Sequence, residues 1–138
     1  MTIVLSSETG TMTQVVQSCS WEAQAYQRAL ELKDLGGQWD RGRSKVPTRE
    51  AINGALIYIS RAAELNLPIL GEPFVAALSS GGVQLEWDQG ERHLAIELLP
   101  DGAARYLVAK SGEIEDGLLG TPSSPDLKFL FGWLAAGR

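Results

Sequence analysis

The spacing of hydrophobic residues changes along the chain and separates helical segments from strands. Over residues 20–35 and 49–66, apolar residues recur every three or four positions, which is typical of amphipathic helices. From residue 74 they alternate with polar residues, which indicates strands with one buried face. The helical spacing returns after residue 124. The pattern therefore predicts two helices, then a group of strands, then a last helix.

Two helices are predicted before the strands, over residues 20–35 and 49–66. Thr48 is suited to cap the second helix at its N-terminus. The apolar residues of this helix repeat on one face, at Ile52, Ala55, Leu56, Ile59, Ala62 and Ala63. Gly54 lowers its intrinsic stability by about 1 kcal/mol relative to alanine. We therefore expect another element to approach the helix closely at Gly54.

Four short strands are predicted between residues 74 and 108, separated by turns rich in Ser, Gly and Asp. Strands joined by such turns pair in order, so we expect an antiparallel meander with one polar face. Residues 111–124 are interpreted as a loop and residues 125–136 as a helix. The predicted fold is α+β: two N-terminal helices packed on a four-stranded antiparallel β-meander, plus a C-terminal helix.

Length and composition fit a single domain. The chain has 138 residues, of which 44% are hydrophobic, and domains of this size are common. We expect residues 1–17, rich in Ser, Thr and Gly, to form a flexible tail and residues 18–138 to form the domain. The N-terminus lacks the basic and apolar regions of a signal peptide, and no apolar run is long enough to span a membrane. The expected location is cytoplasmic.

Few side chains are available for catalysis or metal binding. The single cysteine, Cys19, and the single histidine, His93, exclude an internal disulfide, a thiolate-rich metal site and a His-pair motif. A nucleophilic Cys–His pair is disfavoured because nothing in the pattern brings these two residues together. No glycine-rich loop has the spacing of a phosphate-binding motif. We therefore expect no catalytic residue, no cofactor and no metal.

Four polar residues on the solvent face of the predicted sheet provide the remaining enzymatic alternative. Glu86, Asp88, His93 and Glu97 share that face and could bind a hard cation or transfer protons. A flat, exposed face does not supply the burial that shifts pKa values. The pattern therefore favours a solvated sheet surface over an active site.

Several short motifs resemble those of a bacterial family. They are Trp39-Asp40-Arg41-Gly42, Gly81-Gly82-Val83-Gln84-Leu85-Glu86-Trp87, Asp101-Gly102 and Tyr106-Leu107. Their order is similar to that in a group of small bacterial proteins without an established activity. In that group a WDGYGA loop precedes a helix and a hairpin of the form GGVQLEW…DG…YL. The resemblance covers about residues 32–108 and implies a shared fold. The loop differs, since the family has Gly-Tyr-Gly-Ala where this chain has Arg41-Gly42-Arg43-Ser44.

A tryptophan beside a cluster of bases forms the first candidate binding surface. Its residues are Trp39, Arg41, Arg43, Lys45 and Arg49. The bases could engage phosphate groups or an acidic protein surface. In the alternative interpretation, Trp39 fills the core and the bases are solvated.

The C-terminal helix provides the second candidate surface. Its apolar residues cover more than one face, and the surplus is chiefly Phe129 and Trp133. These aromatic residues could dock another protein or a second copy of the chain. The alternative is a helix buried on all sides between the sheet and the other helices.

The functional hypothesis is a non-enzymatic bacterial protein-interaction module. Its partner would be another protein, and one version of this hypothesis is self-association of two copies of the chain through the C-terminal helix. The module would act as an accessory subunit, an inhibitor or an antitoxin-like neutralising partner. The second hypothesis is a nucleic-acid-associated accessory protein that stacks bases on Trp39 and contacts phosphates through Arg41–Arg49. The net charge of −5 does not favour broad binding to nucleic acid or membranes.

Overall fold

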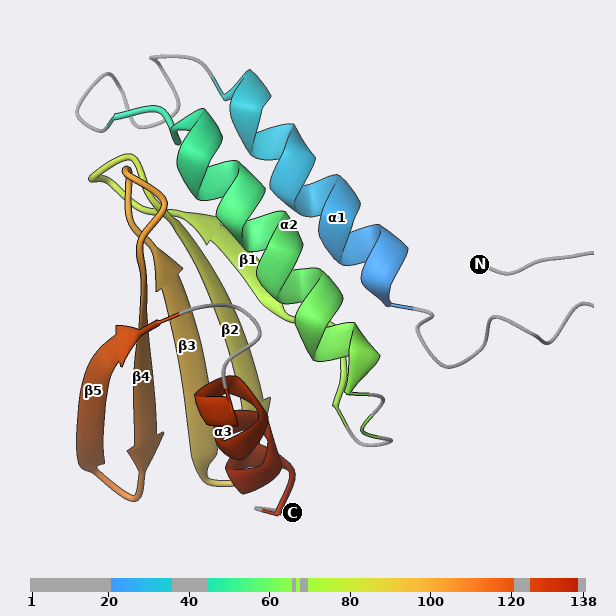
Figure 1. Ribbon diagram of the computed structural model, residues 1–138, viewed down its shortest axis with the longest axis vertical. Coiled ribbons are helices and arrows are strands. Elements are labelled where there is room, and N and C mark those ends of the chain that lie inside the picture. Colours follow the sequence, from blue (N-terminus) through green and yellow to red (C-terminus); the bar gives the residue numbers. More distant parts are fainter. Residues whose placement is uncertain (1–20, 36–44, 66, 68–69, 121–124, 137–138) are drawn as a thin grey trace, which may run out of the picture.

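The computed structural model describes residues 21–35, 45–65, 67, 70–120 and 125–136 (Figure 1). Its helices are α1 (Glu22–Glu31), the short 3-10 helix η3 (Leu32–Asp34), α2 (Arg49–Glu64) and α3 (Pro125–Ala135). Its strands are β1 (Phe74–Ala77), β2 (Val83–Gln89), β3 (Arg92–Leu98), β4 (Ala104–Lys110) and β5 (Glu113–Leu119). The tail predicted over residues 1–17 lies outside the described residues, as does Cys19.

The five strands form one antiparallel sheet in the order β1-β2-β3-β4-β5. The predicted α+β class, with two N-terminal helices, a meander and a C-terminal helix, is confirmed. Each strand pairs with the next in the sequence, since every connection is a short turn. Within the described residues, no helix has the length and apolar character needed to cross a membrane.

The predicted number of strands was wrong, because the segment interpreted as a loop contains β5. Ser111 and Gly112 have positive φ angles of 52° and 88°, which form a two-residue turn that reverses β4. From there β5 pairs with β4 along its whole length. Three of its four inward-facing positions carry Glu113, Glu115 and Gly117, and only the last carries an apolar residue, Leu119, so the strand lacks the apolar alternation that identifies the others.

The core lies on one face of the sheet, under the helices. Its strand residues are Val83, Leu85, Trp87, Leu94, Ile96 and Leu98, all buried. Both α2 and α3 lie on this face, and α1 packs along α2 and reaches β1 (Figure 1). We refer to it as the inner face and to the opposite one as the outer face.

The second helix begins at the predicted cap. The Thr48 hydroxyl oxygen accepts a hydrogen bond from the Ala51 backbone N–H at 3.0 Å, and the hydroxyl donates to the Pro100 carbonyl oxygen at 2.7 Å. The predicted apolar row of α2 is buried, except for the half-buried Leu56. The expected close approach at Gly54 is also present, because a Cβ atom there would lie 2.9 Å from Leu98 Cδ1. These contacts fix α2 on the sheet.

The third helix docks through four buried residues: Leu127, Leu130, Phe131 and Leu134. The Phe131 ring meets the Trp87 ring edge to face, with centroids 4.8 Å apart and planes at 87°. The Trp87 indole N–H donates to the Gly71 carbonyl oxygen at 3.0 Å, so its polar end is satisfied. The packing of Phe131 on Trp87 places α3 over β2 and β3.

Candidate partner-binding groove

Part of the inner face is left open beside α3. The helices make their main contacts with β1, β2 and β3, whereas β4 and β5 form the side of the sheet beyond α3 (Figure 1). The inward-facing residues of these two strands include Tyr106, Val108 and Lys110 on β4 and Glu113 and Glu115 on β5. Among the described elements, a helix therefore borders this strip of sheet on one side only.

The open strip and α3 enclose a groove, which we call the α3–β5 groove. It consists of two hollows of about 420 Å³ and 290 Å³ that share Val108, Glu115 and Trp133. The larger hollow extends toward Tyr106 and Phe129, and the smaller one extends toward the turn between β4 and β5. Because they share lining residues, the two hollows form one continuous depression along α3.

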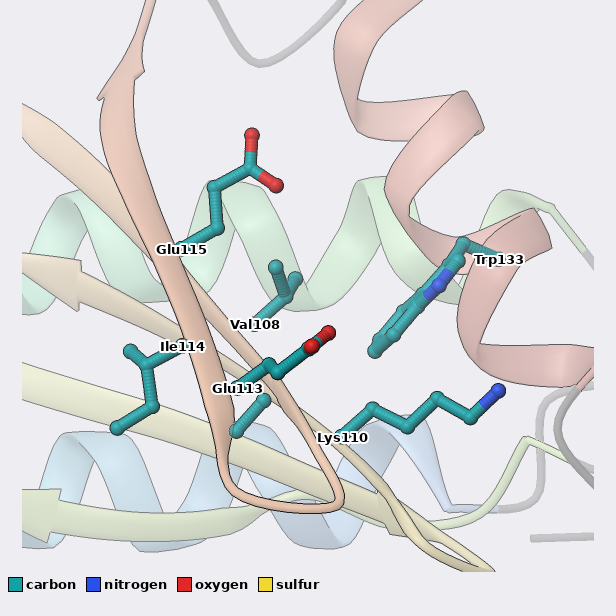
Figure 2. A pocket seen from close by; sticks show the side chains of 7 residues that line it. Val108, Lys110, Glu113, Ile114, Glu115 and Trp133 are labelled. Atoms are coloured by element: carbon teal, nitrogen blue, oxygen red, sulfur yellow. The ribbon is translucent and has the colours of Figure 1, made fainter.

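The lining combines aromatic and aliphatic side chains with carboxylates. Glu113 and Glu115 lie on the side of β5 that faces the Trp133 ring, while Ile114 points to the opposite side (Figure 2). Asp126 adds a carboxylate from the first turn of α3, and Lys110 is the one cation that lines the described part of the groove. The groove is thus apolar along its centre and acidic at both edges.

Trp133 is held in place by an arginine from β3. The Arg92 guanidinium lies 4.9 Å from the centroid of the indole ring, and its Nη1 donates to the Trp133 carbonyl oxygen at 2.5 Å. The indole is half-buried and packs against the core. Phe129, one turn earlier on the same side of α3, is 73% exposed. The helix α3 therefore presents one fixed and one freely accessible aromatic side chain to the groove.

The structure separates the two surfaces that the sequence suggested. Phe129 and Trp133 both line the α3–β5 groove. Lys45 and Arg49 are exposed at the start of α2, at the far end of the molecule from α3 (Figure 1). The other members of the basic cluster, Trp39, Arg41 and Arg43, lie outside the described residues.

The chain around Lys45 is fixed to the turn between β1 and β2. The Lys45 backbone N–H donates to the Ser79 carbonyl oxygen and the Thr48 N–H donates to the Gly81 carbonyl oxygen, both at 3.0 Å. Gly81 has a φ of +98°, and a Cβ atom on Gly82 would lie 2.4 Å from the Leu98 carbonyl oxygen. The two glycines are thus required by the fold, which gives the Gly-Gly motif a structural role.

Several polar residues of the outer face pair with one another, although no ion pair among the described residues involves Glu86. His93 Nδ1 contacts the Asp88 carboxylate across β2 and β3. Arg105 lies between Glu97, at 3.4 Å, and Asp116, at 3.3 Å. No group of three or more His, Cys, Asp or Glu side chains in the described part of the chain is arranged to hold a metal ion. This face is a solvated sheet surface with local ion pairs.

Sequence reasoning missed the sheet side of the groove. Glu113 and Glu115 were assigned to a loop, so the predicted sheet ended at the strand that carries Tyr106 and Val108. The Ser111-Gly112 dipeptide, a few residues after the last predicted strand, was the available signal, because Ser-Gly pairs mark turns.

Comparisons with known proteins found no relative: no family model, no curated protein and no solved structure matches the chain. A functional assignment therefore rests on the geometry of the groove.

Proposed function

We propose that the protein is a non-enzymatic interaction module that binds another protein through the α3–β5 groove. The observation that carries the proposal is the strip of inner face beside α3, which the described helices leave open although Tyr106, Val108 and Trp133 line it. Residues of this kind are normally covered by another layer of structure. A partner that covers them would complete the layer.

The aromatic residues of the groove have the properties of interface anchors. Aromatic side chains dominate the binding energy of protein interfaces when they enter or line pockets. Phe129 is 73% exposed, so burying it on a partner gains the free energy of removing an apolar side chain from water. Trp133 is already ordered by Arg92, which reduces the entropy lost on binding.

The proposed role is that of an accessory, inhibitory or neutralising partner. The groove supplies surface, shape and charge, whereas His93, Glu97 and Arg105 of the outer face are engaged with neighbouring side chains. Such a module would act by occupying or stabilising its target.

The proposal is tested with two exposed phenylalanines that lie on different surfaces. Phe129 lines the groove, while Phe74, on β1, is 66% exposed and lies outside it. A photoreactive phenylalanine analogue is placed at either position in the full chain, and crosslinking is carried out in cells of the native host. We expect a single stoichiometric protein adduct from position 129 and none from position 74.

The identified partner is then purified and titrated against the Phe129→Ala and Phe74→Ala variants. Loss of a central aromatic anchor should weaken binding by about 30-fold, corresponding to roughly 2 kcal/mol. The Phe74→Ala variant should bind like the original chain. Equal effects of the two substitutions, or no adduct at position 129, would exclude the groove as the binding site.

A further inference from the structure

We infer that the α3–β5 groove, if it binds a protein as proposed above, accepts an amphipathic helix whose apolar stripe is flanked by lysine or arginine. The inference rests on the proposed function and adds to it the form and charge of the partner's binding element. Three observations support it: the dimensions of the open strip, the carboxylates at its edges and the charge of the chain itself.

The open strip has the dimensions of one helix. It is two strands wide, and strands lie about 4.8 Å apart, so its width is close to the roughly 10 Å diameter of a helix. The open part runs over residues 106–110 of β4 and 113–117 of β5, because Ala104 and Leu119 at the far end are buried. Five residues of strand give a length of about 17 Å, which matches a helix of about 11 residues. The neighbouring α3 already packs on this face through Leu130 and Phe131. A further helix beside α3 would continue the same layer.

The carboxylates that line the groove make no ion pair within the described part of the chain, unlike Glu97 and Asp116 of the outer face. On the outer face, Glu97 and Asp116 share Arg105. Among the described residues, no ion pair involves Glu113, Glu115 or Asp126. Glu113 and Glu115 lie along the β5 side of the groove, and Asp126 lies on the α3 side. A ligand with cations on both sides of an apolar stripe would therefore pair with both edges.

The charge of the chain argues against a second copy as the occupant. The chain carries a net charge of −5, and α3, the helix that self-association would use, bears one acid, Asp126, and one base, Lys128. Docking α3 of one copy into the groove of another would bring no net positive charge to Glu113 and Glu115, and it would join two chains of the same net charge. Like charges brought together at an interface oppose binding. A basic helix from a different protein has no such conflict.

The inference is tested by titrating the full chain with three labelled 16-residue peptides in a fluorescence anisotropy experiment. The first has a leucine stripe at helical spacing flanked by lysines, and the second has the same stripe flanked by glutamates. The third has the composition of the first in an order that breaks the stripe. We expect the first peptide to bind at least about tenfold more tightly than the other two, because it alone satisfies both the apolar centre and the acidic edges.

Charge variants show whether the peptide binds in the groove. Removing two rim charges with Glu113→Gln and Glu115→Gln should weaken binding of the first peptide about five- to tenfold. The double variant Glu50→Gln and Glu86→Gln removes the same charge from residues outside the groove and should leave binding unchanged. Equal weakening by both pairs would mean attraction by net charge alone and would overturn the inference.

The remaining outcomes separate the inference from the proposed function. If position 129 crosslinks to a protein partner but the lysine-flanked peptide shows no preference, the basic-helix inference fails and the proposed function stands. If neither binds, both fail. If light scattering shows a dimer for the original chain and a monomer for the Phe129→Ala variant, the occupant of the groove is a second copy, and the inference is overturned.

Discussion

The phenol ring of Tyr106 lies over Gly117, its cross-strand partner between β4 and β5. A Cβ atom on Gly117 would lie 2.9 Å from both Tyr106 Cε2 and the phenol oxygen. The glycine therefore makes room for an aromatic side chain that lines the α3–β5 groove. Pairing of an aromatic ring with a glycine on the neighbouring strand also covers the backbone that the glycine leaves bare.

We predict that Gly117→Ala displaces the Tyr106 ring and changes the groove more than the stability. The new methyl group must move the ring, which is half-buried and can turn away from β5. The free energy of unfolding, measured with urea, should change by less than about 1 kcal/mol, while the ring resonances of Tyr106 shift in NMR spectra. Gly120→Ala is the control, because no atom lies within 4 Å of its Cβ position. Unshifted Tyr106 resonances in Gly117→Ala would contradict the prediction.

Two phenylalanines of α3 should differ sharply in their effect on stability. Phe131 is fully buried against Trp87, whereas Phe129 is 73% exposed. Phe131→Ala leaves a cavity in the core and should lower the free energy of unfolding by about 3–5 kcal/mol. Phe129→Ala should change it by no more than about 0.5 kcal/mol. Denaturant unfolding of the two variants measures both effects, and similar losses would mean that α3 is not docked as described.

Local patterns predicted those elements whose two faces have different surroundings. The row on α2 and the alternation in β2 and β3 reflect a core on one side and water on the other, so the residues themselves report burial. Thr48 marked the start of α2 in the same way, because a cap is a local interaction.

The fifth strand and the groove escaped prediction for one common physical reason. No described helix has its main contacts on the inner face of β5, so Glu113 and Glu115 can occupy positions that would otherwise be apolar. Because apolar and polar residues do not alternate in β5, its sequence resembled that of a loop. Because β5 was not predicted, the strand that forms one side of the groove was missing from the predicted fold. The aromatic surplus of α3 was visible in the sequence, but the surface that it faces depends on tertiary structure.

The two helical glycines offer a test of the close contact between α2 and the sheet. At Gly54 a Cβ atom would lie 2.9 Å from Leu98 Cδ1, and Leu98 is fully buried and cannot move aside freely. Gly54→Ala should therefore destabilise the fold by about 1–2 kcal/mol, since overpacking outweighs the gain in helix propensity. At Gly132 in α3 no atom lies within 4 Å, so Gly132→Ala should stabilise by up to about 1 kcal/mol. Thermal unfolding compares the two, and a stabilising Gly54→Ala would contradict the packing of α2 on Leu98.

A buried tyrosine should make the fold sensitive to alkaline pH. Tyr58 is 3% exposed, and burial raises the pKa of its phenol above the ordinary value of about 10. Below that pH the phenol is neutral in both states and stability does not depend on it. As the pH rises further, the unfolded chain loses the proton first, so the folded state loses stability. Tyr58→Phe removes this proton, and its melting temperature should fall less between pH 9 and pH 11 than that of the original chain. If the melting temperatures of the two proteins fell equally over this pH range, Tyr58 would not contribute to the loss of stability at alkaline pH.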